Sequence, residues 1–132
     1  MATDHFKDCE FVNSYMASCY GVDNLLPAEF ISRRDFIFEQ LEILRALLGK
    51  PIVINSGFRC EKLNRLVGGA RNSRHMDAYA VDVTCGSKVD NLHMFCVLNN
   101  SDIPFHKVIF EKGAQWLHIE FDGSNNRFTF TL

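Results

Sequence analysis

The sequence has 132 residues, which is enough for one domain with a buried core that needs no disulfide bonds. Its net charge of −2 argues against nucleic-acid binding, which usually requires a basic excess. It contains no apolar run of about 18 residues that could span a membrane, and its acidic N-terminus is unlike a secretory signal. We therefore expect a single domain over residues 1–132, monomeric and cytoplasmic, with its five cysteines reduced.

The first half of the chain is predicted to contain two helices and one strand. Aromatic residues among polar ones predict a short helix over residues 8–18. A turn over residues 21–27 then leads, through Pro27 at the first helical position, into a second helix. In that helix, apolar residues recur at steps of three, four and seven from Phe30 to Leu48, which indicates one buried face. A run of β-branched residues predicts a strand over residues 51–55.

The second half is predicted to alternate strands with turns and one further helix. Glu61–Leu66 is expected to form one or two helical turns, followed by a glycine turn and a loop over residues 72–79. A Ser-x-x-Asp capping pattern at Ser87 predicts a helix that continues to Leu98. Strands are predicted at Ala80–Thr84, Lys107–Glu111, 116–121 and 127–131, the last at a sheet edge. This order predicts an α+β domain with a small antiparallel sheet and N-terminal helices packed on it.

Three residues have side chains of the right type to hold a metal ion. His75 lies in the loop before a strand, and Asp82 lies within that strand between two valines, where an unpaired charge would be costly. His118 lies in a later strand. Two imidazoles and one carboxylate suit a zinc ion that keeps a fourth position open for water, as catalytic zinc sites do.

The residues around these three carry a resemblance to a known family. The pattern consists of Ser56-Gly57-Phe58-Arg59, Leu63-Asn64, Val67-Gly68-Gly69, Asn72-Ser73-x-His75, Ala80-x-Asp82 and Trp116-Leu117-His118-Ile119. It resembles the zinc D-Ala-D-Ala carboxypeptidase family, which includes phage and bacterial peptidoglycan peptidases and shares its fold with the Hedgehog signalling domain. The lead-in, Asp8-x-x-Phe11-x-x-Ser14, is similar to the start of a short phage-type branch. The resemblance covers residues 6–121 and implies one zinc ion per chain, held by His75, Asp82 and His118.

The resemblance also implies roles for charged residues beside the metal. Hydrolysis needs a base, and in one branch of the family a glutamate lies three residues before the last histidine. That position is Gln115 here, which cannot titrate. Other members place the acid at the end of the preceding strand, where this chain has Glu111; Glu120 is the second candidate. Arg59 resembles the family arginine that faces the substrate, where it can pair with a terminal carboxylate or stabilise an oxyanion.

Further residues keep two interpretations each. Ser73 can hydrogen-bond the substrate or cap its own loop, and Trp116 can line the cleft or pack in the core. Ala78 stands where the family usually has glycine.

The function that the resemblance implies is zinc-dependent hydrolysis of peptide bonds next to D-amino acids in peptidoglycan stem peptides. The enzyme would be a carboxypeptidase or an endopeptidase, such as a phage endolysin that is made in the host cytoplasm and released to the cell wall. The alternative is an inactive zinc-binding interaction module on the same fold, which Gln115 and Ala78 favour.

Overall fold

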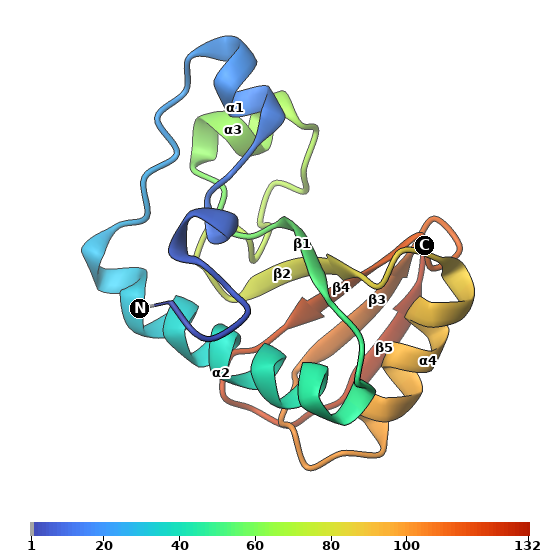
Figure 1. Ribbon diagram of the computed structural model, residues 1–132. Helices are drawn as coiled ribbons and strands as arrows, with labels where there is room; N and C mark the ends of the chain where they lie inside the picture. The colour runs from blue at the N-terminus through green and yellow to red at the C-terminus, as the bar shows by residue number, and fades with distance from the viewer. Residues whose placement is uncertain (1) are drawn as a thin grey trace.

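The computed structural model describes residues 2–132 and is built around one five-stranded sheet (Figure 1). The strands are β1 (Val53–Ser56), β2 (Ala80–Thr84), β3 (Lys107–Glu111), β4 (Trp116–Glu120) and β5 (Phe128–Thr131), in the order β1-β2-β4-β3-β5. All neighbouring pairs are antiparallel except β3 and β5. The predicted α+β fold is confirmed, but the sheet is not purely antiparallel. Because β5 turns back from β4 and joins the far edge of β3, it runs in the same direction as β3.

Two longer helices lie on one side of this sheet in Figure 1: α2 (Ile31–Leu48) and α4 (Lys88–Asn99). Their apolar residues share one core with alternate residues of the strands. The fully buried members are Ile37, Phe38, Leu41 and Leu44 of α2, Met94 and Leu98 of α4, and Val81, Val83, Val108, Leu117 and Ile119 of the sheet. The predicted periodicity of the long helix is therefore confirmed, and strand alternation places Asp82, His118 and Glu120 on the opposite face of the sheet.

The prediction of one helix over residues 8–18 is wrong. The chain forms a 3-10 turn over Asp8–Phe11 and then a separate helix, α1 (Tyr15–Tyr20). The break occurs because Ser14 has an extended backbone and caps α1, with its hydroxyl accepting a hydrogen bond from the Ala17 amide at 3.2 Å. The break also frees the carbonyl of the buried Phe11, which accepts a hydrogen bond from the Phe58 amide at 2.7 Å.

The start of the long helix also differs from the prediction. Pro27 does not occupy its first position, because Pro27 precedes a 3-10 turn over Ala28–Phe30 and α2 itself begins at Ile31. The end of α2 agrees with the pattern of the sequence, since Gly49 caps the helix with a left-handed backbone of φ 68°.

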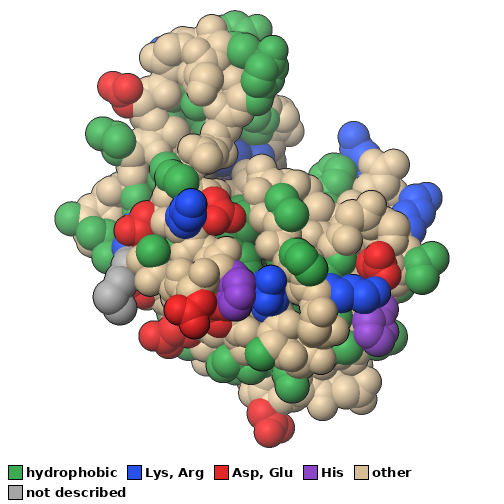
Figure 2. All heavy atoms as spheres, viewed as in Figure 1, with side chains coloured by type: hydrophobic (Ala, Val, Ile, Leu, Met, Phe, Trp, Pro, Cys, Tyr) green, Lys and Arg blue, Asp and Glu red, His purple; other side chains and the backbone are tan. Residues whose placement is uncertain are grey.

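The remaining helix, α3 (Glu61–Leu66), contacts α1, and the two form a lobe beyond one end of β1 and β2 (Figure 1). Positive and negative side chains are interspersed on the molecular face that Figure 2 shows. All five cysteines are free thiols. Within residues 2–132, no helix is both long enough and apolar enough to cross a membrane.

Candidate metal centre

The three metal-ligating candidates meet on the sheet face opposite α2 and α4. Asp82 of β2 and His118 of β4 are paired across the two strands, so that their side chains lie next to each other on this face. His75 reaches the same place from the turn that precedes β2. One possible ligand atom from each of the three residues lies within 4.8 Å of the others. The structure thus brings the three residues together although 43 positions separate His75 from His118 in the sequence.

Asp82 is the centre of this cluster. Its Oδ1 lies 3.2 Å from Nε2 of His75 and 3.0 Å from Nδ1 of His118. The two imidazole rings have centroids 5.0 Å apart and are inclined at 69°. Both histidines are nearly inaccessible, with 1% of His75 and 8% of His118 exposed. Two nitrogens and one carboxylate oxygen therefore converge on one point, a donor set that fits zinc.

The electrostatics of the cluster favour an anionic carboxylate. Burial alone would raise the pKa of Asp82, but the contacts of its carboxylate with His118 and His75 outweigh this effect and hold the pKa well below its usual range. Burial would likewise lower the pKa of His118, whereas its hydrogen bonds to Asp82 and Glu120 raise this pKa to about 9. The cluster is thus arranged to stabilise positive charge between the two rings, which is also what a bound cation requires.

The orientation of His75 is fixed by the Ser-Gly-Phe-Arg segment. Nδ1 of His75 donates a hydrogen bond to the Gly57 carbonyl at 2.7 Å, which leaves Nε2 to face Asp82. The Arg59 amide donates in return to the His75 carbonyl at 3.1 Å. At position 57 a side chain has no space, because a Cβ would lie 2.4 Å from the Phe11 carbonyl oxygen. Glycine is therefore required here for close backbone approach and not for an unusual φ.

The turn that carries His75 is held by α2 and by Tyr79. Arg33 donates from Nη1 to the Asp77 carbonyl at 2.7 Å, and its guanidinium stacks 4.2 Å from the centroid of the Tyr79 ring. Arg74 stacks on the same ring at 4.7 Å. Ala78 is fully buried and has a left-handed backbone with φ 61°, a conformation that alanine adopts at a cost and glycine adopts freely. A left-handed backbone at position 78 is the conformation that glycine adopts most easily, and glycine is the residue that the family usually has there.

The cleft above the cluster has a volume of about 620 Å³ and includes the other predicted residues. Arg59, Ser73, Glu111, Trp116 and Glu120 all line it. Burial lowers the pKa of Arg59, and the negative charges of Asp82 and Glu111 partly offset this effect.

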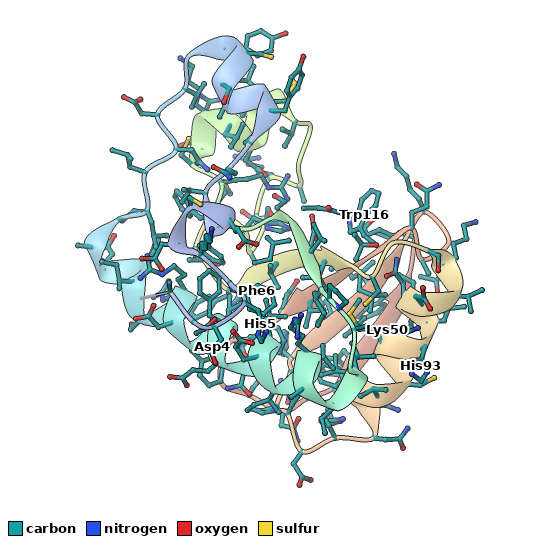
Figure 3. All side chains as sticks on the ribbon, in the orientation of Figure 1. Asp4, His5, Phe6, Lys50, His93 and Trp116 are labelled. Atoms are coloured by element: carbon teal, nitrogen blue, oxygen red, sulfur yellow. The ribbon has the colours of Figure 1, made fainter. Side chains whose placement is uncertain are left out.

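Arg59, Trp116 and Ser73 differ in the hydrogen bonds that their side chains make. The Nε atom of Arg59 and the Nε1 atom of Trp116 are buried and have no hydrogen-bond partner within residues 2–132. The Ser73 hydroxyl accepts from the His75 amide at 3.2 Å, which matches the capping interpretation. Figure 3 shows Trp116 apart from His5 and His93, and these two histidines are exposed and do not line the cleft.

Glu111 and Glu120 lie on opposite sides of His118 on this sheet face. Glu111 pairs with Trp116 at one end of β3, and Glu120 pairs with Lys107 at the other end. Glu120 is only 4% exposed, and its Oε2 lies 2.8 Å from Nε2 of His118. The two candidate bases therefore differ: one borders the cleft beside Arg59, and the other is bound to a metal-ligating candidate.

Two asparagines that support the site were missed in the sequence. Asn24 brackets Arg59, since its amide donates to the Phe58 carbonyl and accepts from the Cys60 amide, both at 2.8 Å. Asn91 of α4 is fully buried and donates to the Ala114 and Gln115 carbonyls in the β3–β4 turn. A polar residue on the apolar face of α4 was the signal that could have identified Asn91.

The sequence is similar to proteins of known type. A family model described as Peptidase M15 matches residues 4–120. Over 50 residues the chain is 48% identical to the zinc D-Ala-D-Ala carboxypeptidase of Streptomyces albus G. The aligned segment is 37% of this chain and spans about a fifth of that relative, 20% of its length.

Proposed function

Because this chain belongs to the peptidase M15 family, we propose that it is a zinc-dependent peptidase acting on peptide bonds next to D-amino acids in peptidoglycan stem peptides. The observation that carries the proposal is the convergence of His75, Asp82 and His118 at the base of a cleft. The similarity to a zinc D-Ala-D-Ala carboxypeptidase supports both the metal and the type of bond.

Zinc fits the residues that are present. Nε2 of His75, a carboxylate oxygen of Asp82 and Nδ1 of His118 would hold one ion per chain. When bound, zinc supplies a Lewis acid that polarises a carbonyl and makes water a better nucleophile at neutral pH. The remaining steps depend on side chains of the cleft.

Glu111 is proposed as the general base. Glu111 lies two residues after Ile109 on β3, and Ile109 pairs with His118 on β4. Glu111 is therefore on the same face of the sheet as His118. Diagonal neighbours of this kind are roughly 7–8 Å apart, so Glu111 can face the open side of the centre without joining the ligands. There it would take a proton from the attacking water and pass it to the leaving amine.

Arg59 is proposed to bind the negative charge of the substrate. It borders the cleft between Asp82 and Glu111, and its Nε has no partner within the described part of the chain. A guanidinium in this position can pair with the terminal carboxylate of a peptide, and it can also stabilise the oxyanion that develops at the scissile carbonyl. A carboxylate role favours release of a terminal D-amino acid, whereas an oxyanion role fits a carboxypeptidase and an endopeptidase equally. Trp116 would contact the peptide from the neighbouring wall.

The biological setting is proposed from the same resemblance. A monomer acting on peptidoglycan, with phage lysis as its role, fits the similarity of the lead-in segment to the short phage-type branch. Under this proposal the protein accumulates in the host cytoplasm and reaches the cell wall on release.

Digestion of purified sacculi tests the proposal. The zinc-loaded protein should release peptides or free D-alanine that mass spectrometry identifies, and the mass of each product gives the bond that is cut. Asp82→Asn should release nothing above background, because it removes a proposed ligand. If the parent protein binds zinc but releases nothing from sacculi of several cross-link types, the proposed function becomes that of an inactive zinc-binding interaction module.

A further inference from the structure

Glu120 is a buried carboxylate for which the proposed hydrolysis has no use. It follows His118 by two positions on β4, and its side chain is on the same face of the strand. Its Oε2 lies 2.8 Å from Nε2 of His118, whereas Nδ1 of the same ring lies 3.0 Å from Oδ1 of Asp82. The two nitrogens of His118 thus have different carboxylate partners on opposite edges of the ring.

The chemistry of these partners determines which nitrogen carries the proton. An ionised carboxylate only accepts hydrogen bonds, so Nε2 of a neutral His118 donates its N–H to Glu120. The lone pair of the ring then remains on Nδ1, which faces Asp82. His75 has the opposite arrangement, because the Gly57 carbonyl accepts from Nδ1 and leaves the lone pair on Nε2. Each histidine therefore presents its free nitrogen to the same point.

We propose that Glu120 is a positioning residue that fixes the tautomer and the ring orientation of His118 for zinc binding. The inference rests on the proposed zinc site and goes beyond it by giving Glu120 a role other than that of the base. A carboxylate behind a metal-bound histidine orients the ring and makes its free nitrogen a stronger donor.

The surroundings of Glu120 argue against proton transfer to the substrate. Glu120 is only 4% exposed, and its residue pairs across the sheet with Lys107. If Oε2 of Glu120 turned toward a water in the cleft, it would leave a buried N–H of His118 without its acceptor, which is unfavourable. Glu111 has no such bond to break among the hydrogen bonds of residues 2–132.

Zinc affinity, measured by competition with a chromophoric chelator, tests this role without any peptidase assay. Glu120→Ala should weaken zinc binding by ~10- to 100-fold, the usual effect of losing an outer hydrogen-bond partner. Glu120→Gln keeps an oxygen that accepts from Nε2, and its affinity should stay within about threefold of the parent, since the acceptor and the tautomer are kept. Glu42→Ala is the matched control, because Glu42 contacts His5 at 2.7 Å outside the cleft. Its zinc affinity should equal that of the parent.

The tautomer of His118 can be measured directly, and this second test does not require Glu120→Ala to fold. Long-range proton–nitrogen NMR of the zinc-loaded parent and of Glu120→Gln should show His118 protonated at Nε2 and not at Nδ1. Protonation at Nδ1 overturns the proposal, and so does a folded Glu120→Ala that binds zinc as tightly as the parent. A parent that binds zinc with this tautomer yet hydrolyses nothing contradicts the peptidase function alone. A parent that binds no zinc contradicts both.

Discussion

Replacing Gly57 by alanine should disturb the centre through the backbone alone. The added Cβ would lie 2.4 Å from the Phe11 carbonyl oxygen and 2.9 Å from the Phe11 Cα. Backbone atoms of a buried residue cannot move aside as a flexible side chain does. The Gly57 segment must therefore shift, and with it the carbonyl that accepts from Nδ1 of His75.

The expected cost follows from two contributions. Inserting a methyl group into a packed site costs about 1–3 kcal/mol, and weakening the hydrogen bond from the Phe58 amide to the Phe11 carbonyl adds about 0.5–1.5 kcal/mol. The sum is about 1.5–4.5 kcal/mol. For a chain of 132 residues the unfolding entropy is about 0.28 kcal/mol/K, so Tm should fall by about 5–16 °C. Zinc affinity should fall by about 10-fold or more, because the acceptor of His75 moves.

Calorimetry and zinc titration of the same variant separate these effects. Gly49→Ala is the control: it has open space around its Cβ but a left-handed φ of 68°, so it should cost only about 1–2 kcal/mol of backbone strain and leave zinc affinity unchanged. The reasoning is refuted if Gly57→Ala melts within about 2 °C of the parent, equivalent to about 0.5 kcal/mol, and binds zinc equally well.

Three further substitutions test the cleft and its support. Glu111→Gln should reduce stem-peptide hydrolysis by ~10²-fold or more with zinc content and Tm preserved; an unchanged rate in a hydrolysis assay would exclude Glu111 as the base. Arg59→Lys should slow hydrolysis of free-acid peptides, because lysine lacks the planar fork of arginine. The parent protein should likewise hydrolyse amidated peptides more slowly than free-acid peptides, and equal rates on both would exclude a carboxylate role. Asn91→Ala leaves the Ala114 and Gln115 carbonyls without their donor, and calorimetry should show a loss of about 2–4 kcal/mol; a loss below about 0.5 kcal/mol would mean that water replaces the amide.

The sequence was sufficient for the elements that local patterns determine. The apolar periodicity of α2 and the alternation of β2 each reflect a buried face, so their positions were predictable. The break at Ser14 was not predicted, because aromatic residues on both sides gave a continuous helical pattern. The helix is interrupted by the Ser14 cap and by the hydrogen bond from the Phe58 amide to the Phe11 carbonyl. A hydrogen bond between residues so far apart in the sequence leaves no periodic pattern.

The candidate site was predictable only in part for a similar reason. Strand alternation places Trp116, His118 and Glu120 on one face, and the sequence contains that information. It does not show that Glu120 turns toward His118 while Glu111 borders the cleft near Arg59, since side-chain partners depend on the register of β3 and β4. The role of Gly57 was equally hidden, because the contact that requires glycine comes from Phe11, far earlier in the chain.

The most direct test is the rate of stem-peptide hydrolysis as zinc is added stepwise to the metal-free protein. If His75, Asp82 and His118 hold one catalytic ion, the rate should start at background, rise in proportion to added zinc and stop rising at one equivalent per chain. A full rate before any zinc is added, or no hydrolysis at any zinc concentration, would contradict a zinc peptidase built on these three residues.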